Sequence, residues 1–269
     1  MMEKRLPCGI DLKVVAQDSD LYLDMALSML EVIRQCAAER KPCVMIVPVG
    51  PTAQYPVLAE LVNRLDISLR HVHFFNMDEY MVSPTETIDP ESSLSFHKRM
   101  NTEFYDRVRP DLVMPASQRH FPEPGREAEY DRLIAGLGGA DACFGGLGIN
   151  GHIAFNEPPE AGDPITVDAF AALGTRVLPI SRETRTINAN GYLRGDIRGM
   201  PPYCITIGMK QILEARRVYI ALSAPWQHGI ARHVFEDPVQ PQIPASLLRL
   251  RENVLFCAPR SIGESLFTS

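Results

Sequence analysis

Short apolar runs rich in β-branched residues alternate along the chain with segments whose apolar residues recur at helical spacing, and this alternation most constrains the fold. The run from Cys43 to Val47 is apolar throughout, which is typical of a buried strand. The segment before it, from about Leu21 to Arg40, predicts a helix that ends before Pro42. Strands that alternate with helices form largely parallel sheets covered on both faces, so we predict an α/β fold of this kind.

The other elements are expected from the same two patterns. Further strands are expected at 13–17, 71–75, 142–146, 176–179, 203–207, 217–222 and 254–257. Further helices are expected at about 52–65, with Thr52 as the N-cap, and at 92–108, 126–135, 210–214, 225–235 and 244–250. Residues 158–175 are expected to form a loop-rich surface excursion. We expect a single α/β domain over 1–269.

Three polar segments follow strand candidates, at 48–52, 76–80 and 147–157, and we expect each to form a loop. In open parallel sheets, ligands bind beyond the carboxyl ends of the strands, where the loops converge. We therefore expect the active site to be built from these three segments.

Two adjacent carboxylates, Asp78 and Glu79, follow the strand candidate at 71–75. The two side chains point differently, so one can face a pocket while the other makes a structural hydrogen bond. A carboxylate at a strand end can act as a general base. It can also be a turn residue or a helix N-cap, and the residues at 76–80 leave both readings open.

A glycine-rich segment from Gly145 to Gly151 is followed directly by His152. Its glycines allow tight turns and expose backbone N–H groups to an anion or a hydroxyl-rich ligand. The segment lacks the spacing of a dinucleotide-binding loop and the Lys-Ser/Thr pair of a P-loop, which argues against a nucleotide. His152 and Glu157 can shuttle a proton near neutral pH, although a histidine bonded to local backbone fits the spacing equally well.

Composition argues against several classes of protein. The formal net charge of −6 argues against a nucleic-acid-binding face and a polybasic membrane segment. No stretch is long and apolar enough for a signal peptide or a membrane span, so we expect a cytoplasmic protein without membrane partners.

The residues that often bind metals do not form a metal site in the sequence. The six cysteines contain no Cys-x-x-Cys pair, so buried thiols are expected in place of disulfides or a zinc site. His71 and His73 face one side of a strand but lack a third ligand, so we expect them to be structural. Trp226 and Met209 are expected to be packing residues.

In order and spacing, these motifs resemble the glucosamine-6-phosphate deaminase family over about residues 20–258. The segment from His152 to Pro158 is the most specific part, because the related 6-phosphogluconolactonases share the Gly-His step and diverge directly after it. The resemblance implies a Rossmann-like three-layer α/β sandwich with a mostly parallel sheet. It also implies a metal-free, cofactor-free conversion of an aldose to a ketose with loss of ammonia. The resemblance lies in Asn76–Tyr80, Pro90–Ser92, Ser95–Phe96, Gly146–Pro158 and Glu183–Arg185.

The resemblance also implies roles for individual residues. His152 would pass a proton to or from the ring oxygen during ring opening, and Glu157 would orient and tune His152. Asp78 would take the proton from C2 and deliver it to C1 through an enolamine, after which water replaces the amine at C2. Asn150 joins this set, although many relatives have Asp at its position and Asn cannot share ionic work with His152.

The substrate-binding positions implied by the resemblance depart from the family pattern at the phosphate. Pro51 lacks a backbone N–H in a segment where the family usually has a Thr-Gly-Gly-Thr-like loop. Gln227 or His228 stands in place of a phosphate-binding lysine, and Asn190 in place of a substrate-binding arginine. The full expected set is Gly50, Pro51, Thr52, Gly148, Gly151, Asn190 and Gln227.

Loss of two charge-assisted bonds would weaken phosphosugar binding by about a hundredfold or more. Arg182, Arg185, Arg194 or a partner subunit could compensate for this loss. The leading interpretation is conversion of glucosamine 6-phosphate, or a close analogue, to fructose 6-phosphate and ammonia. The alternative is an isomerase, deaminase or lactonase-type hydrolase for a different sugar derivative, including an unphosphorylated one.

A third interpretation is non-enzymatic, because related folds serve as sugar-phosphate-sensing domains of transcription regulators. The residues before the first helix are too few for a helix-turn-helix segment, and the net charge is acidic, so we expect no nucleic-acid partner. The expected partner is a small sugar or sugar phosphate. The family contains monomers and larger rings, which leaves a homo-oligomer open.

Overall fold

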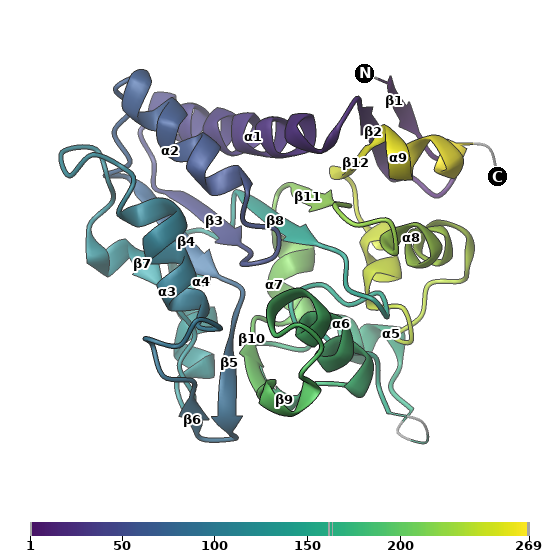
Figure 1. Ribbon diagram of the computed structural model, residues 1–269. Helices are drawn as coiled ribbons and strands as arrows, with labels where there is room; N and C mark the ends of the chain where they lie inside the picture. The colour runs from purple at the N-terminus through teal and green to yellow at the C-terminus, as the bar shows by residue number, and fades with distance from the viewer. Residues whose placement is uncertain (1, 161, 163, 268–269) are drawn as a thin grey trace.

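The computed structural model describes residues 2–160, 162 and 164–267, and its centre is an eight-stranded sheet (Figure 1). The strand order is β1-β2-β12-β11-β8-β3-β4-β7. Neighbours are parallel, except that β1 pairs with β2 in the antiparallel sense. The bounds are β1 Met2–Arg5, β2 Asp11–Val15, β3 Cys43–Val47, β4 Val72–Asn76, β7 Arg119–His120, β8 Ala142–Gly146, β11 Val218–Ala221 and β12 Val254–Pro259.

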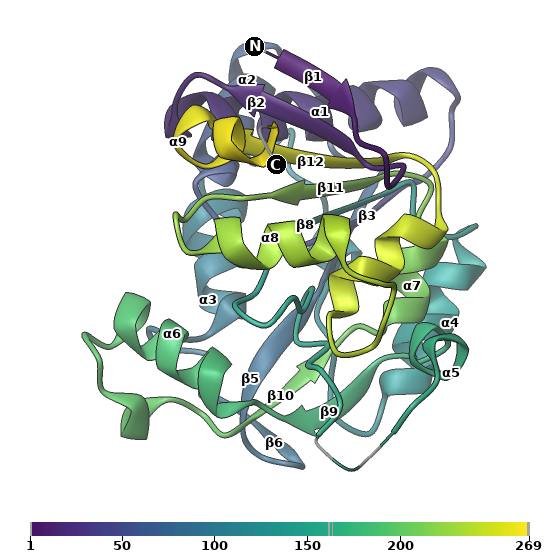
Figure 2. The same ribbon diagram turned by 90° about the vertical axis from the view of Figure 1, so that its right-hand side faces the viewer.

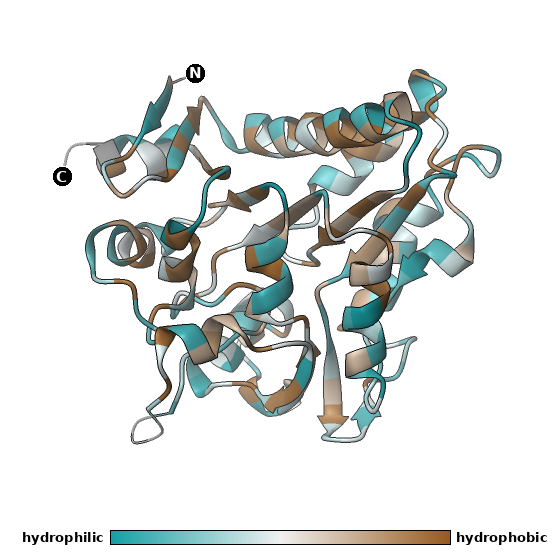
Figure 3. Ribbon diagram, turned by 180° about the vertical axis from the view of Figure 1, so that it is seen from behind, coloured by the Kyte–Doolittle hydropathy of each residue, from teal (hydrophilic) through white to brown (hydrophobic). Residues whose placement is uncertain are grey.

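Helices cover both faces of this sheet, which confirms the predicted Rossmann-like class (Figure 2). In β3, Met45 and Val47 join one apolar cluster, whereas Val44 and Ile46 join another. This two-sided burial explains why β3 carries no polar residue, and Figure 3 shows it as apolar. The first cluster includes residues of α1 (Asp18–Ala38), α2 (Gln54–Arg64) and α3 (Phe96–Met100), and the second includes residues of α4 (Glu127–Gly136), α7 (Met209–Glu214) and α8 (Gln227–Glu236).

A second, antiparallel sheet lies beside the first, with the order β6-β5-β10-β9. Its strands are β5 Asp78–Ser83, β6 Glu86–Thr87, β9 Arg176–Pro179 and β10 Tyr203–Thr206. Met77 alone separates β4 from β5, so the chain passes directly from one sheet to the other. The prediction of a polar loop at 76–80 is therefore wrong, because Asp78 and Glu79 are strand residues.

Several other expectations differ from the structure. The helix expected at 92–108 is the short α3 followed by a π-helical turn at Asn101–Tyr105. Thr52 does not cap α2, whose N-cap residue is Ala53. The excursion at 158–175 contains the short helix α5 (Val167–Ala171), while residues 161 and 163 lie outside the described part.

Several elements were not expected from the sequence, among them β1, β5, β6, β7, helix α6 (Arg182–Tyr192) and helix α9 (Arg260–Gly263). The helix expected at 244–250 is present as a 3-10 helix. Within the described residues, none of the helices combines the length and the apolar character needed to cross a membrane.

Candidate active site

A cleft opens at the carboxyl ends of β3, β8 and β11, next to the start of β5 and the inner side of α6. Two of the three segments expected to form the site, at 48–52 and 147–157, contribute loop residues to its lining. The third contributes Met77, Asp78 and Tyr80, of which Asp78 is the first residue of β5. The position of the cleft agrees with the rule that open parallel sheets bind ligands at this edge.

Asp78 faces this cleft and is only 6% exposed. Within the described chain, no hydrogen-bond donor reaches its carboxylate. Burial, together with the nearby charge of Glu79, raises the pKa of Asp78 well above its ordinary value. A desolvated carboxylate of this kind is a stronger base than one in water, which suits proton abstraction from carbon.

Glu79 has a different, structural set of contacts. Its Oε1 accepts hydrogen bonds from the backbone N–H groups of Tyr80 and Phe96, and its Oε2 accepts from the His97 N–H and the Ser95 hydroxyl. Burial raises the pKa of Glu79, and these hydrogen bonds oppose the shift. The two adjacent carboxylates thus divide as expected, with one facing the cleft and the other holding the start of α3.

His152 is joined to Glu157 through Asn150. The Nδ1 of His152 lies 2.7 Å from Asn150 Oδ1, and Asn150 Nδ2 donates to Glu157 Oε2 at 2.6 Å. The direct distance between His152 Nδ1 and Glu157 Oε2 is 3.7 Å. Because the Asn150 amide nitrogen is turned to Glu157, the pattern assigns the Nδ1–H tautomer to neutral His152 and leaves its Nε2 able to accept a proton.

The charge state of His152 follows from its burial. Burial lowers the pKa of His152, and the charge of Glu157 opposes this shift in part. The histidine is therefore neutral at pH 7, as a group that accepts a proton must be. Asn150 transmits the orientation set by Glu157 without adding a second negative charge next to the imidazole.

Two glycines make close approaches that other residues would block. A Cβ atom at Gly148 would collide with the imidazole of His152. A Cβ atom at Gly146 would come within 2.7 Å of the Gly50 carbonyl oxygen, where the loop after β3 meets the end of β8. Gly151 has a φ of +84°, a left-handed conformation that favours glycine. The glycine-rich segment therefore leaves the space that the His152 ring occupies.

The second sheet holds the segment that follows His152. Asn156 Nδ2 donates to the carbonyls of Ile153 and Ile207. The Phe155 N–H donates to Thr206 Oγ1 at 3.0 Å, and Thr206 is the β10 partner of Asp78 in the antiparallel register. Arg176 of β9 donates to Asn156 Oδ1 at 2.8 Å. The sheet that carries Asp78 thus also supports the segment that follows His152.

The residues implied for substrate binding divide into two groups. Gly50, Pro51 and Gly148 line the cleft, whereas Thr52 and the buried Gly151 are not part of its lining. Asn190 is exposed and outside the lining, while Asn188, two residues earlier on α6, faces the cleft and donates to the Tyr80 hydroxyl at 3.0 Å. The position expected from the resemblance is therefore two residues from the one that lines the cleft.

Gln227 lines the cleft, but its side chain is occupied internally. Its Oε1 accepts the N–H groups of Ser223 and Ala224 at 2.6 and 2.8 Å. Its Nε2 donates to the Leu147 carbonyl at 2.6 Å. Gln227 is 4% exposed, so it ties the loop after β11 to the loop after β8.

Sequence reasoning missed several aromatic and polar lining residues. Tyr192 and Trp226 line the cleft and are 38% and 37% exposed, so the expectation that Trp226 is a packing residue is wrong. Met209, by contrast, is fully buried as expected. Asn188 and Tyr192 are four residues apart, which places them on one face of α6. That spacing could have identified them if α6 had been predicted.

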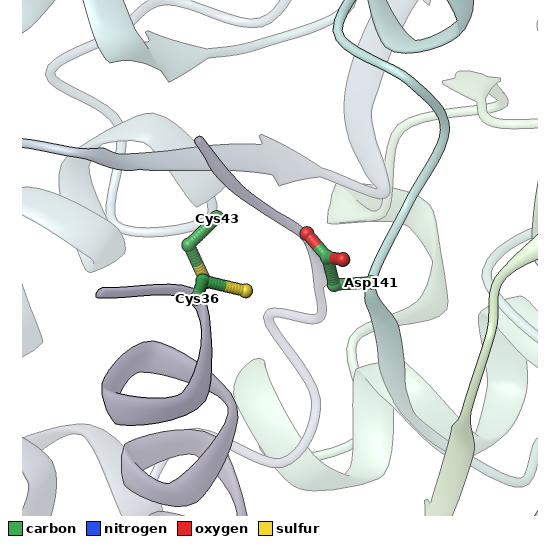
Figure 4. Close-up of side chains that lie close together, drawn as sticks. All are labelled: Cys36, Cys43 and Asp141. Carbon is green, nitrogen blue, oxygen red and sulfur yellow. The ribbon is translucent and has the colours of Figure 1, made fainter. Parts of the chain in front are cut away.

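A separate cluster of possible metal ligands lies at the opposite ends of the strands (Figure 4). The side-chain ligand atoms of Cys36, Cys43 and Asp141 lie within 4.8 Å of one another, and all three residues are buried. The carboxylate of Asp141 already accepts the Val44 N–H and pairs with Lys41 and Arg216. Burial raises the pKa of both thiols, so neither supplies a thiolate at neutral pH.

The remaining cysteines and the strand histidines have structural surroundings. All six cysteines are free thiols, and all except Cys8 are buried. His71 Nε2 lies 3.1 Å from the Ile33 carbonyl. His73 stacks on His120, and burial lowers the pKa of His120 to about 4. Burial lowers the pKa of His73 as well, so the two stacked rings are neutral at pH 7.

The chain is similar to proteins described as glucosamine-6-phosphate deaminases. It is 31% identical over 210 residues to the one from Lachnoclostridium phytofermentans, covering 76% of this chain and 80% of that protein. It is 30% identical over 242 residues to the one from Bacillus velezensis, covering 87% and 92%. A search against protein-family models found no match.

The fold is also similar to solved structures. A monomeric glucosamine-6-phosphate deaminase superimposes with a TM-score of 0.79 at 23% identity, covering 94% of this chain and 98% of that chain. The 6-phosphogluconolactonase from Trypanosoma brucei superimposes with a TM-score of 0.68 at 18% identity, covering 98% and 100%. At these identities, the structural likeness supports the fold alone.

Proposed function

Because the chain belongs to the glucosamine-6-phosphate deaminase family, we propose that it is an amino-sugar isomerase and deaminase. It converts glucosamine 6-phosphate, or a close analogue, to the corresponding ketose (fructose 6-phosphate for that substrate) and ammonia. One observation carries this proposal beyond family membership: an unpaired, buried carboxylate and a neutral histidine line the same cleft. The reaction needs two proton-transfer groups of this kind.

The proposed steps use both groups in turn. His152 moves a proton between the anomeric hydroxyl and the ring oxygen, which opens the ring to the aldehyde. Asp78 removes the proton from C2 while O1 of the aldehyde takes up a proton from solvent, which gives an enolamine. Asp78 then delivers its proton to C1, and the nitrogen lone pair forms the double bond of a C2 iminium. Water adds at C2 and the nitrogen leaves as ammonia, which gives the ketose. A base poised in a desolvated site contributes about 10²- to 10⁴-fold to such a step.

The remaining polar groups of the site would position His152. Glu157 and Asn150 hold its Nδ1 side, so the Nε2 side stays an acceptor. Gly148 leaves room for the ring, and Thr206 and Asn156 hold the segment 153–157 against the second sheet. These contacts support positioning roles for Glu157, Asn150, Gly148 and Gly151.

Release of ammonia tests the proposal. The purified chain is incubated with millimolar glucosamine 6-phosphate, glucosamine and galactosamine, and ammonia and ketose are measured together. We expect equal amounts of both products from at least one amino sugar, and their loss in Asp78→Asn. Hydrolysis of a sugar lactone, with no ammonia from any amino sugar, would instead support the lactonase-type alternative.

We also propose a cytoplasmic location and leave open a homo-oligomer. Six free thiols, most of them buried, are typical of proteins from a reducing compartment, which supports the location. Fractionation of the native cells, with the protein detected by antibody, tests the location. Light scattering of the purified chain measures the oligomeric state.

A further inference from the structure

We propose that the cleft selects an unphosphorylated amino sugar, held by aromatic faces and neutral hydrogen-bonding groups. This inference rests on the proposed function, because it concerns the substrate of the same site. The cleft lacks the cations that would bind a phosphate. It offers aromatic faces and neutral polar groups, which suit an uncharged sugar.

The lining of the cleft offers no permanent positive charge. Among the residues that the structure describes, no lysine or arginine is part of it. Its titratable groups are Asp78, His152, Tyr80 and Tyr192. Because burial lowers the pKa of His152, the histidine is neutral at pH 7. A dianionic phosphate placed here would lose its water without gaining an ion pair.

Two backbone donors next to α8 that could replace a cation are already used. The N–H groups of Ser223 and Ala224 precede the first turn of α8, where free N–H groups favour an anion. The Gln227 side chain of that turn accepts both, at 2.6 and 2.8 Å. Across the cleft, Pro51 has no N–H. The amide oxygen of Gln227 thus occupies the position that an anion would take at the Ser223 and Ala224 N–H groups.

Arginines outside the lining are engaged elsewhere or face solvent. Arg185 donates to the Ile197 and Met200 carbonyls, and Arg176 donates to Asn156. Arg182 and Arg194 are exposed. Arg99 lies over the ring of Tyr192, 4.2 Å from its centroid, and so stands next to the lining without being part of it.

The aromatic residues supply what an uncharged sugar needs. Trp226 and Tyr192 line the cleft with more than a third of each residue exposed. Their rings can stack on the C–H faces of a sugar, and such contacts need no charge. Asn188 and Ser223 add neutral polar groups for sugar hydroxyls.

The first test compares substrates with the wild-type chain. Ammonia release is measured for glucosamine, galactosamine and their 6-phosphates, and kcat/KM is compared within each pair. We expect the unphosphorylated sugar to be preferred by at least about tenfold. A preference for either 6-phosphate overturns the inference and leaves the proposed function standing, as would happen if Arg99 entered the cleft. No ammonia from any of the four overturns both.

The second test changes the residues that carry the inference. In Gln227→Lys, the added cation and the freed N–H groups should raise the ratio of kcat/KM for glucosamine 6-phosphate over glucosamine by about tenfold or more. In Trp226→Ala, KM for glucosamine should rise with a smaller change in kcat, while Trp226→Phe keeps most of the affinity. An unchanged KM in Trp226→Ala would contradict the stacking role.

Two controls keep these variants interpretable. Leu65→Ala removes an exposed apolar side chain outside the cleft lining and should leave both ratios unchanged. Circular dichroism and thermal unfolding report whether Gln227→Lys folds, since Gln227 is buried. If it does not fold, the wild-type ratio and the Trp226 pair still decide the question.

Discussion

Asp78 is buried at the start of a strand with a second carboxylate beside it in the sequence. Burial, and after it the charge of Glu79, raises the pKa of Asp78, and within the described chain no hydrogen-bond donor or cation opposes this shift. A group kept in such a state lowers the stability of the folded protein at neutral pH. This is the behaviour expected of a residue that is retained for its reactivity.

Asp78→Asn should therefore stabilise the protein while abolishing ammonia release. The folded state binds the Asp78 proton more tightly than the unfolded state, so the stability of the wild type falls as pH rises from about 4 through the folded-state pKa. Asn cannot ionise at this position, so the stability of Asp78→Asn does not fall with pH for this reason. Thermal unfolding should show a higher Tm for the variant at pH 7 and no difference below about pH 4.

Asp106→Asn is the control for this comparison, because Asp106 is exposed and outside the cleft lining. It should leave both the Tm and the activity within error of the wild type. A variant at Asp78 that is less stable at pH 7 would mean that an unseen donor pairs with the carboxylate.

His152 offers a second test at the same scale. In Asn150→Asp, a carboxylate would replace the amide oxygen 2.7 Å from His152 Nδ1, which should raise the pKa of His152. The limb of the kcat/KM profile that reports His152 should then move to higher pH. Titration of the His152 ring protons by NMR gives the same pKa independently of turnover. No movement in either measurement would contradict the bridge through Asn150.

At the level of elements, the side chain of Glu79 caps the start of helix α3. The helix spans only Phe96–Met100, too short to be stable from its own hydrogen bonds. Glu79 reaches it from β5 and satisfies two of its first N–H groups, besides the Ser95 hydroxyl. Phe96 also lines the cleft, so the cap contributes to the wall of the site.

Glu79→Ala should lower the free energy of unfolding by about 3–5 kcal/mol, because it leaves several buried donors unpaired. Urea unfolding at pH 7 measures the change. The matched control is Glu91→Ala, which removes an exposed carboxylate paired with Lys98. A surface pair of that kind contributes at most about 1 kcal/mol. A loss at Glu79 no larger than the control would contradict the capping role.

At the scale of the whole molecule, the second sheet connects the two halves of the site. The large sheet supplies the loops after β3, β8 and β11, whereas β5 supplies Asp78. Strand β10 pairs with β5 and, through Thr206, holds the segment that follows His152. The relative position of the base and the histidine therefore depends on a contact between the two sheets.

Thr206→Val tests that dependence with an isosteric change. It removes the acceptor for the Phe155 N–H and should lower kcat by about ten- to a hundredfold, with a smaller effect on KM. The expected loss of stability is about 1–3 kcal/mol. Thr206→Ser keeps the hydroxyl and should restore most of the activity. Steady-state kinetics and urea unfolding of both variants check this, and equal losses in the two would contradict the hydrogen-bonding role.

Much of the large sheet could be predicted because its strands are buried on both faces. Continuous apolar runs such as β3 and β8 carry that information within a few residues. Helix α6 could not be predicted in this way, because its buried residues are Thr184 and Ala189, and one small apolar side chain gives no apolar periodicity. With α6 missed, Asn188 and Tyr192 were missed as lining residues of the cleft.

The sequence by itself determined the α/β class, the edge of the sheet where the site lies, and the residue types available for proton transfer. These follow from local patterns, since apolar periodicity and the order of strands need no distant partner. Only the tertiary structure decided which carboxylate faces the cleft, how Asn150 joins His152 to Glu157, and that the Gln227 amide accepts the N–H groups just before α8. Each of these depends on hydrogen bonds whose direction no run of neighbouring residues specifies.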